Sequence, residues 1–346
     1  MAFVHLHTHT EYSLLDGSNK ITEYVARVKE LGMNAAAITD HGVMYGVIDF
    51  YKECKKQGIR PILGCEVYVA PGSRFDRELS HGDDRYYHLV LLAENNVGYQ
   101  NLIKIVSIGF VDGYYYKPRV DMETLEKYHE GIIALSACLA GVVPRYLQRG
   151  MYEEAKEIAL KHRAIFGENN YFLELQSHGI EAQELVNQQL VRMSKETGIE
   201  LVCTNDIHYT YADDAAPHDV LLCIQTGKKL TDTDRMRYEG GQYFVKSEEQ
   251  MAALFPYAPQ ALANTQKIAD RCNVEIEFGV TKLPHYQVPE GYDSWTYLNK
   301  LCFEGLQERY GDRAEELKPR LTYELETIHK MGYVDYFLIV WDFINY

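Results

Sequence analysis

Short apolar segments alternate with longer amphipathic segments over roughly the first 205 residues of the chain. Strands are predicted at residues 3–7, 35–39, 61–69, 88–93, 131–136, 171–175 and 201–204. Helical periodicity lies between them, in stretches such as 21–31, 43–57, 152–166 and 182–197. Strands separated by helices of this length form βαβ units around a parallel sheet. Seven such units favour a closed barrel over an open sheet, although alternation alone does not establish closure.

The sequence changes character after His208. An apolar stretch at 219–226 precedes a polar, turn-rich stretch at 227–241, and helical periodicity returns at 248–272. A segment with two prolines and a glycine, 282–291, predicts a domain boundary. A helical region follows from Ser294. Its last residues, 336–346, form an apolar helix without a C-cap, so we expect the chain to be a piece of a longer protein.

Composition limits the compartment and the class of protein. The N-terminus has no basic stretch followed by an apolar core, and the longest apolar run, around 132–143, is shorter than the roughly 18 residues of a membrane span. The seven cysteines lack CxxC spacing, which indicates reduced thiols, so we predict a cytoplasmic protein without membrane contact. The net charge of −15 disfavours non-specific nucleic-acid binding and is compatible with cation binding.

The first predicted strand carries three histidines at alternating positions, His5, His7 and His9. Side chains on a strand alternate between its faces, so these imidazoles share one face while Val4 and Leu6 share the other. Stacked imidazoles are a recognised metal-binding arrangement. A chance surface cluster is the alternative interpretation.

Further candidate ligands follow or occupy later strands. Asp40-His41 comes directly after the second strand, where parallel α/β folds gather their functional groups, although a helix N-cap beside a histidine would look the same. Glu66 lies inside an apolar strand, where a carboxylate is costly unless it is paired or bound to a metal. Asp206 and His208 follow the last strand and share a face if the backbone stays extended, and a closed barrel would place them beside His7 and His9.

Two weaker candidates come from the middle of the chain. His88 opens the fourth predicted strand, and Cys138 follows the fifth. For Cys138 alone an inert core residue is the more common role, because free cysteine is among the most buried residue types. The main evidence for a metal site is therefore the joint pattern, in which histidines and carboxylates recur where successive strands end.

This donor set predicts the chemistry. Imidazoles, carboxylates and one thiolate suit Zn, Mn or Fe better than an all-oxygen Mg or Ca site. Four ligands hold one structural zinc, so about nine candidates predict two or three divalent ions. Clustered ions polarise a phosphoryl group and activate water, so water rather than a side chain is the predicted nucleophile. No Gly-rich phosphate loop and no convincing serine or cysteine triad is present.

Longer stretches resemble a known family. Residues 5–17, HLHTHTEYSLLDG, resemble the opening motif of the PHP (polymerase and histidinol phosphatase) superfamily, in the form seen in bacterial replicative DNA polymerase III alpha subunits. Segments 37–42, 64–68 and 205–209 resemble further motifs of that superfamily, and 218–228 and 331–343 resemble stretches typical of the alpha subunit. The resemblance covers essentially the whole chain. It implies a distorted (β/α)7 barrel followed by a C-terminal helical segment.

The resemblance also implies a ligand set for three ions. The family's site would use His7, His9, Asp16, His41, Glu66, His88, Cys138, Asp206 and His208. The first ion would be held by His7, His9, Glu66 and Asp206, and Glu66 would bridge to a second ion held by His88 and Cys138. Asp16, His41 and His208 would hold the third. Glu66, Asp206 and His208 are the residues to which the resemblance gives a catalytic role, and His5 stands outside the ligand set.

The domain layout implied by the family is a PHP metal-dependent phosphoesterase domain at 1–280 and a linker with the first helices of a truncated polymerase palm at 281–346. The full-length protein would be a DNA-directed DNA polymerase whose catalytic aspartates lie beyond Tyr346. The expected partners are the 3′ end of single-stranded DNA, the remainder of the polymerase chain, and replisome subunits such as a proofreading exonuclease subunit.

Three functions remain open. The first is an active phosphodiesterase that proofreads as a 3′–5′ exonuclease. The second is a module without hydrolytic activity, in which bound metals only stabilise the fold and the surface docks the palm or a proofreading subunit. The third is a small-molecule phosphatase related to histidinol phosphatase, since a shared fold does not determine the substrate.

One further segment could contact nucleic acid. Residues 114–119, YYYKPR, combine aromatic side chains that stack on bases with cations that hold phosphates. A loop whose tyrosines pack on the barrel or on the missing palm is the alternative.

Overall fold

The computed structural model describes residues 3–78, 84–280 and 282–346, and the chain divides into two units, Met1–Glu275 and Ile276–Tyr346. The strands of the first unit are β1 (Ala35–Ile38), β2 (Arg60–Val69), β3 (Tyr87–Ala93), β4 (Tyr114–Tyr115), β5 (Lys117–Val120), β6 (Ile132–Leu135), β7 (Tyr171–Leu175) and β8 (Leu201–Cys203). Its α-helices are α1 (Ile21–Glu30), α2 (Val47–Gln57), α3 (Asn96–Val111), α4 (Met122–Tyr128), α5 (Val142–Gln148), α6 (Tyr152–Phe166), α7 (Glu181–Thr197), α8 (Ala215–Thr226), α9 (Glu248–Leu254) and α10 (Pro259–Arg271). Short 3₁₀ turns lie at Ala212–Asp214 and Glu239–Gly241.

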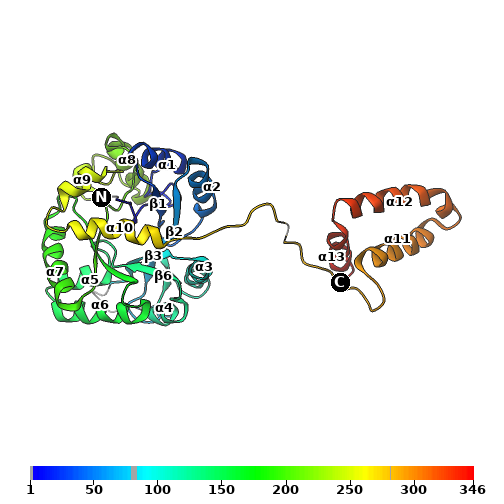
Figure 1. Cartoon of the computed structure of the whole chain (residues 1–346), viewed down its shortest axis with the longest axis horizontal. Coiled ribbons are helices and arrows are strands. Elements are labelled where there is room, and N and C mark those ends of the chain that lie inside the picture. Colours follow the sequence, from blue (N-terminus) through cyan, green and yellow to red (C-terminus); the bar gives the residue numbers. More distant parts are fainter. Residues whose placement is uncertain (1–2, 79–83, 281) are drawn as a thin grey trace. The chain divides into compact units, whose positions relative to one another are not determined.

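The strands form one curled sheet in the order β4-β5-β2-β3-β6-β7-β8, with β1 paired to β2. Figure 1 shows the helices arranged around this sheet. The family resemblance predicted an α/β fold of the distorted barrel type with a helical C-terminal segment, and the structure confirms it. The sheet is not wholly parallel, however, because β3 runs antiparallel to both β2 and β6. The described part of the β2–β3 connection contains no crossover helix, and only an antiparallel neighbour can be reached without one.

The expected strand at 3–7 is replaced by an extended segment with a single bridge, between Thr8 and Ile207. His9 N–H donates to the Ile207 carbonyl (2.8 Å), and Thr39 N–H donates to the Thr8 carbonyl (2.9 Å). The segment therefore lies between the end of β1 and the end of β8. Val4 N–H is satisfied by the Thr265 hydroxyl (3.0 Å) instead of a neighbouring strand, which explains why no ladder forms there.

The core lies inside the curl of the sheet. Val4 and Leu6 are fully buried together with apolar side chains of β1, β2, β3, β6, β7 and β8. Helix α10 contributes Ile268, Ala269 and Cys272 to the same cluster. Burying each large aliphatic side chain stabilises the fold by about 1.5–3 kcal/mol. Because Val4 and Leu6 point into this core, the alternate residues His7 and His9 point to the opposite face, as the alternation predicted.

The second unit contains α11 (Ser294–Tyr310), a 3₁₀ turn (Gly311–Arg313), α12 (Ala314–Lys330) and α13 (Val334–Asn345). Leu298, Leu325, Val334 and Leu338 form its small core. The Asp335 carboxylate accepts hydrogen bonds from the Ser294 hydroxyl (2.7 Å) and Tyr286 N–H (3.1 Å), which ties α13 to the start of α11. Among the described residues, no helix has the length and apolar character that a membrane crossing requires.

Candidate metal centre

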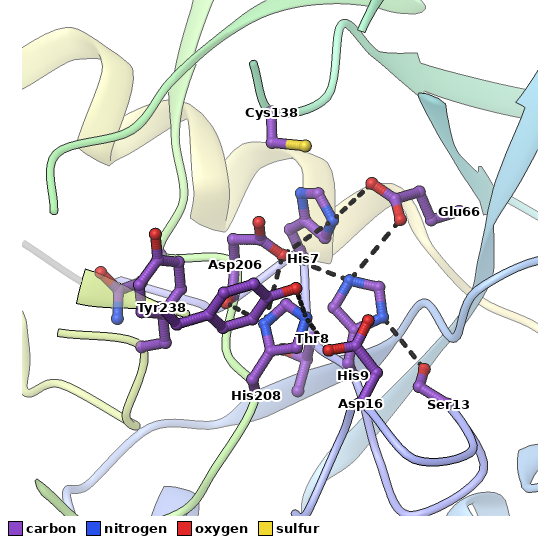
Figure 2. Close-up of polar contacts among 12 residues, drawn as sticks. His7, Thr8, His9, Ser13, Asp16, Glu66, Cys138, Asp206, His208 and Tyr238 are labelled. Carbon is purple, nitrogen blue, oxygen red and sulfur yellow. Dashed lines mark hydrogen bonds and ion pairs between the residues drawn. The ribbon is translucent and has the colours of Figure 1, made fainter. Parts of the chain in front are cut away.

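Side chains from the strand ends converge on one polar cluster. The structure brings together all nine predicted ligands through contacts no longer than 4 Å, and Figure 2 shows seven of them around a common centre. Three overlapping groups have donor atoms within 4.8 Å of one another: His9, His41 and His208; His7, His9 and Glu66; and His41, Glu66 and His88. The side chains come from the N-terminal segment and from the ends of β1, β2, β3, β6 and β8, so the curl of the sheet assembles them.

Glu66, on β2, occupies the middle of the cluster and is 1% exposed. Its Oε1 lies 3.1 Å from His7 Nε2 and 3.0 Å from His88 Nδ1, and its Oε2 lies 2.6 Å from His41 Nδ1. Burial raises the pKa of Glu66, but His88, His41 and His7 together outweigh burial and hold this pKa well below its usual range. The carboxylate is thus ionised and faces imidazoles on both oxygens, as a bridging ligand does.

Asp206 faces Glu66 across the two histidines of the N-terminal segment. Its Oδ1 lies 3.3 Å from His7 Nε2 and 3.2 Å from His9 Nε2. Burial raises the pKa of Asp206, but His7 and His208 outweigh it and lower this pKa far below the ordinary value. The backbone does not stay extended here, because Asp206 has a φ of +44°, so the condition for Asp206 and His208 to share a strand face is not met. The predicted proximity of the N-terminal segment to the residues after the last strand is confirmed, since Thr8 forms a bridge with Ile207.

A third group of side chains, Asp16, His41 and His208, surrounds the His9 ring. Asp16 Oδ2 is 3.0 Å from His41 Nε2, and Asp16 Oδ1 is 3.8 Å from His208 Nε2. The His9 ring lies between the other two imidazoles, with centroid distances of 3.8 Å to His41 and 4.4 Å to His208. Burial lowers the pKa of His9 to about 3, with His41 and His208 acting in the same direction, so His9 is neutral and able to ligate.

Cys138 lies at the edge of the cluster, with Sγ 3.8 Å from His88 Nδ1. Figure 2 shows its sulfur directed toward the side chains of Glu66 and His7. Burial, with Glu66 and Asp206 adding to it, raises the pKa of this thiol well above its usual value. A thiolate at this position would need a nearby cation to stabilise it.

Backbone strain concentrates at these residues. Among the described residues, the non-glycine positions with positive φ are Leu15 (61°), Tyr116 (62°), Ala137 (64°) and Asp206 (44°). Leu15 precedes Asp16, and Ala137 precedes Cys138. Such conformations cost of order 1–3 kcal/mol and persist where the surrounding structure enforces them, commonly at functional sites. Three of the four are therefore candidate ligands or direct neighbours of one.

Unsatisfied buried atoms give an independent test of metal binding. Buried atoms without a hydrogen-bond partner include His7 Nε2, His9 Nε2, Asp16 Oδ1, His41 Nε2, Glu66 Oε1 and Asp206 Oδ1. At least nine in ten buried polar groups in proteins have a partner, so six exceptions in one cluster need an explanation. The atoms face one another, and they are imidazole nitrogens and carboxylate oxygens. This donor set fits divalent metal ions.

Outer residues hold the ligands in orientation. His7 Nδ1 lies 2.7 Å from Glu174 Oε1, and the Thr204 hydroxyl donates to the same oxygen. His9 Nδ1 lies 3.1 Å from the Ser13 hydroxyl, which donates to Asp40 (2.7 Å). A ligating histidine ordinarily uses its second ring nitrogen in this way. His7 and His9 thus present Nε2 to the centre.

Glu174 is a site residue that the sequence analysis missed. It is 2% exposed in the middle of β7, among apolar residues. Like Glu66, Glu174 is a carboxylate within an apolar strand, where it is costly unless paired, and this signal is present in the sequence. His5 remains outside the cluster, because its Nε2 lies 2.8 Å from the Lys246 carbonyl.

Tyr238 is a second missed residue, and it comes from the polar stretch after α8. Its hydroxyl lies 3.1 Å from His208 Nε2, and Figure 2 shows the ring covering one side of the centre. Arg235 anchors this stretch to α8 through both Asp219 oxygens (2.5 and 2.6 Å). Burial raises the pKa of Tyr238 well above its usual value, so the hydroxyl stays protonated and can donate a hydrogen bond. Local sequence carries no signal for this contact.

Replacing Glu174 with glutamine is expected to weaken metal binding by about 10–100-fold, because the carboxylate that orients His7 is lost. Competition with a chromophoric chelator measures the affinity. Glu168→Gln, which removes an exposed carboxylate just before β7, is the matched control. Equal affinities for the two variants would show that Glu174 does not support His7.

Comparison with known proteins agrees with this geometry. Residues 5–178 match the family model described as "PHP domain", and residues 296–346 match "Bacterial DNA polymerase III alpha NTPase domain". The chain is similar to proteins named DNA polymerase III subunit alpha from Treponema pallidum (47% identity over 347 residues, 100% of this chain) and Borreliella burgdorferi (45% over 346 residues, 99% of this chain). The chain spans about 30% of the length of each of these relatives.

A solved structure of a protein from Bifidobacterium adolescentis, described as a metal-dependent phosphoesterase, overlaps with 74% of this chain and 96% of its own, at 11% identity and a TM-score of 0.38. The family assignment therefore rests on sequence. The PHP match covers just over half of the 346 residues. It includes the seven candidate ligands from His7 to Cys138, whereas Asp206 and His208 lie beyond it. The chain belongs to the PHP family, with a segment of the bacterial DNA polymerase III alpha type at its C-terminal end.

Proposed function

We propose that the first unit is a metal-dependent phosphodiesterase that removes nucleotides from the 3′ end of single-stranded DNA. One observation carries the proposal: nine candidate ligands converge in a buried cluster whose unsatisfied atoms face one another. Residues 1–280 form the phosphoesterase domain in this proposal, and 281–346 form a linker and the first helices of a polymerase palm region. The whole protein would be a DNA-directed DNA polymerase with replisome partners, including a proofreading exonuclease subunit.

The nine residues divide into three binding positions. His7, His9, Glu66 and Asp206 would hold one ion, Glu66 with His88 and Cys138 a second, and Asp16 with His41 and His208 a third. The donor set suits Zn, Mn or Fe. When bound, such ions polarise a phosphoryl group and lower the pKa of water.

The chain's own residues set the geometry of the reaction. Asp206 Oδ1 lies 3.3 Å from His7 Nε2 and 3.2 Å from His9 Nε2, and Glu66 approaches the same two nitrogens at 3.1 and 3.7 Å. Glu174 and Ser13 fix both rings by their second nitrogens, so little reorganisation is needed when substrate binds. His208 is oriented by the Asp206 carbonyl, 2.8 Å from its Nδ1, and by the Tyr238 hydroxyl, 3.1 Å from its Nε2.

The test measures the rates at which the purified 346-residue chain hydrolyses two substrates. A 3′-end-labelled single strand is expected to lose its terminal nucleotide faster than histidinol phosphate releases inorganic phosphate. Mass spectrometry of the same preparation is expected to find two or three bound divalent metal ions per chain. Faster release of phosphate from histidinol phosphate would overturn the proposal in favour of a small-molecule phosphatase.

A further inference from the structure

The hairpin formed by β4 and β5 has a tyrosine at its tip where the backbone favours glycine. Tyr115 pairs with Lys117, so Tyr116 alone makes the turn, with a φ of +62°. Glycine adopts this conformation without strain, whereas a side chain makes it costly. The Tyr116 side chain is 59% exposed, so core packing does not account for it. Among the described non-glycine residues with positive φ, Tyr116 is the one that is neither a candidate ligand nor next to one in the sequence.

The hairpin lies directly beside the metal centre. Strand β5 pairs with β2, the strand that carries Glu66, through Tyr68 and Arg119. A Cβ atom placed on Gly42, the residue after His41, would lie 3.0 Å from Pro118 Cγ and 2.8 Å from a ring carbon of Tyr68. The loop that carries His41 therefore packs against the hairpin without room for a side chain.

A continuous series of rings and cations connects the metal ligands to the hairpin tip. The Tyr68 ring is 5.2 Å from the His88 ring and 4.8 Å from the Tyr86 ring. Lys117 Nζ lies 5.3 Å above the Tyr68 ring, and the Arg85 guanidinium lies 4.2 Å above the Tyr116 ring. The series begins at a ligand and ends at an exposed aromatic side chain.

The series places two cations beside the candidate metal centre of a chain whose net charge is −15. Within the described ranges, neither the Arg85 nor the Lys117 side chain is within ion-pair distance of a carboxylate, and the charged group of each lies above an aromatic ring. Many other arginines and lysines on this chain are paired, as Arg235 is with Asp219. Cations without carboxylate partners beside a hydrolytic centre are suited to a phosphate backbone.

We propose that Tyr116, Arg85 and Lys117 form a binding surface for the single-stranded DNA adjoining the scissile phosphate. Tyr116 stacks on a base, and the two cations contact phosphates. Stacking of this kind is independent of sequence, as removal of any mismatched nucleotide requires. The inference rests on the proposed phosphodiesterase function and adds the surface that distinguishes a polynucleotide from a small ester.

Tyr116→Gly tests the surface, because it removes the ring and relieves the strained backbone together. The midpoint of thermal unfolding is expected to stay equal or rise. Affinity for a fluorescein-labelled oligo(dT), measured by anisotropy at constant salt, is expected to fall about tenfold. The ratio of kcat/KM for oligo(dT) to kcat/KM for bis(p-nitrophenyl) phosphate is expected to fall by a similar factor.

Arg85→Gln provides a second measurement with a matched control. Loss of one phosphate contact is expected to reduce the slope of log affinity against log salt concentration by about 0.7. Arg192→Gln removes the same charge from an arginine that lies 4.2 Å above Tyr152, on helices that carry none of the metal-centre residues, and is expected to leave this slope unchanged.

The two proposals fail in different ways. Unchanged oligo(dT) affinity and an unchanged kcat/KM ratio in Tyr116→Gly would overturn the inference and indicate that the hairpin contacts protein. Absence of hydrolysis of either ester by the wild-type, metal-loaded chain would overturn the phosphodiesterase, while weaker oligo(dT) binding by Tyr116→Gly would still support the strand-binding surface.

Discussion

Asp206→Asn is expected to reduce phosphodiester hydrolysis on the order of 10³-fold while the fold stays intact. The carboxylate oxygen that faces His7 Nε2 (3.3 Å) and His9 Nε2 (3.2 Å) becomes part of a neutral amide, a much weaker metal ligand. Loss of several kcal/mol of transition-state stabilisation corresponds to this factor. Asparagine also tolerates the positive φ of this position, so the substitution introduces no backbone strain.

The measurement is release of the terminal nucleotide from a 3′-end-labelled single strand, together with metal content by mass spectrometry. Asp270→Asn, at an exposed carboxylate paired with Arg60, is the matched control and is expected to behave like the wild type. Full hydrolysis by Asp206→Asn with an unchanged metal content would remove Asp206 from the proposed site.

Stripping the metals with a chelator is expected to abolish hydrolysis and to lower the melting temperature by roughly 5–10 °C. An ion present at about 100 times its dissociation constant stabilises a folded chain by about 2.7 kcal/mol, and each kcal/mol shifts the melting temperature by about 2–4 °C in a large domain. The physical cause is that buried atoms such as His7 Nε2, His9 Nε2 and Glu66 Oε1 lose their ligating partner.

Adding back Zn, Mn or Fe separately identifies the ion that restores both properties. The result also separates catalysis from a structural role. If metal removal lowers the melting temperature but the protein hydrolyses neither substrate with or without metal, the result would support a module in which the metals only stabilise the fold. An unchanged melting temperature and unchanged hydrolysis after complete removal would contradict any metal centre at these residues.

Much of the fold was predictable because hydrophobic periodicity is a local property. The helices at Tyr152–Phe166 and Glu181–Thr197 agree closely with the predicted ranges, and most strands were placed within a few residues. The direction of β3 was not predictable, since strand direction depends on which neighbour the chain pairs with. Residues 114–119 were interpreted as a segment that contacts nucleic acid or as a loop that packs its tyrosines, and not as a hairpin. The two short strands of this hairpin pair with each other, and β5 pairs with β2, which is distant in sequence.

Eight of the nine candidate ligands were found from residue type and position, because each follows or occupies an apolar predicted strand, where an ionisable group needs a reason to be present. Asp16 came only from the family resemblance. Glu174 satisfies the same condition and was overlooked. Tyr238 and Arg85 carry no such local mark, because their roles arise from contacts with residues about 30 positions away, His208 and Tyr116.

By itself, the sequence determined which residues face the core and which carry metal-binding chemistry, because alternation along an extended segment places Val4 and Leu6 on one face and His7 and His9 on the other. Only the tertiary structure decided that these donors meet. The sheet curls until Thr8 lies beside Ile207, which brings Asp206 to the histidines at the opposite end of the unit's sequence. Such long-range closure is set by packing of the whole sheet around its core, and no local pattern encodes it.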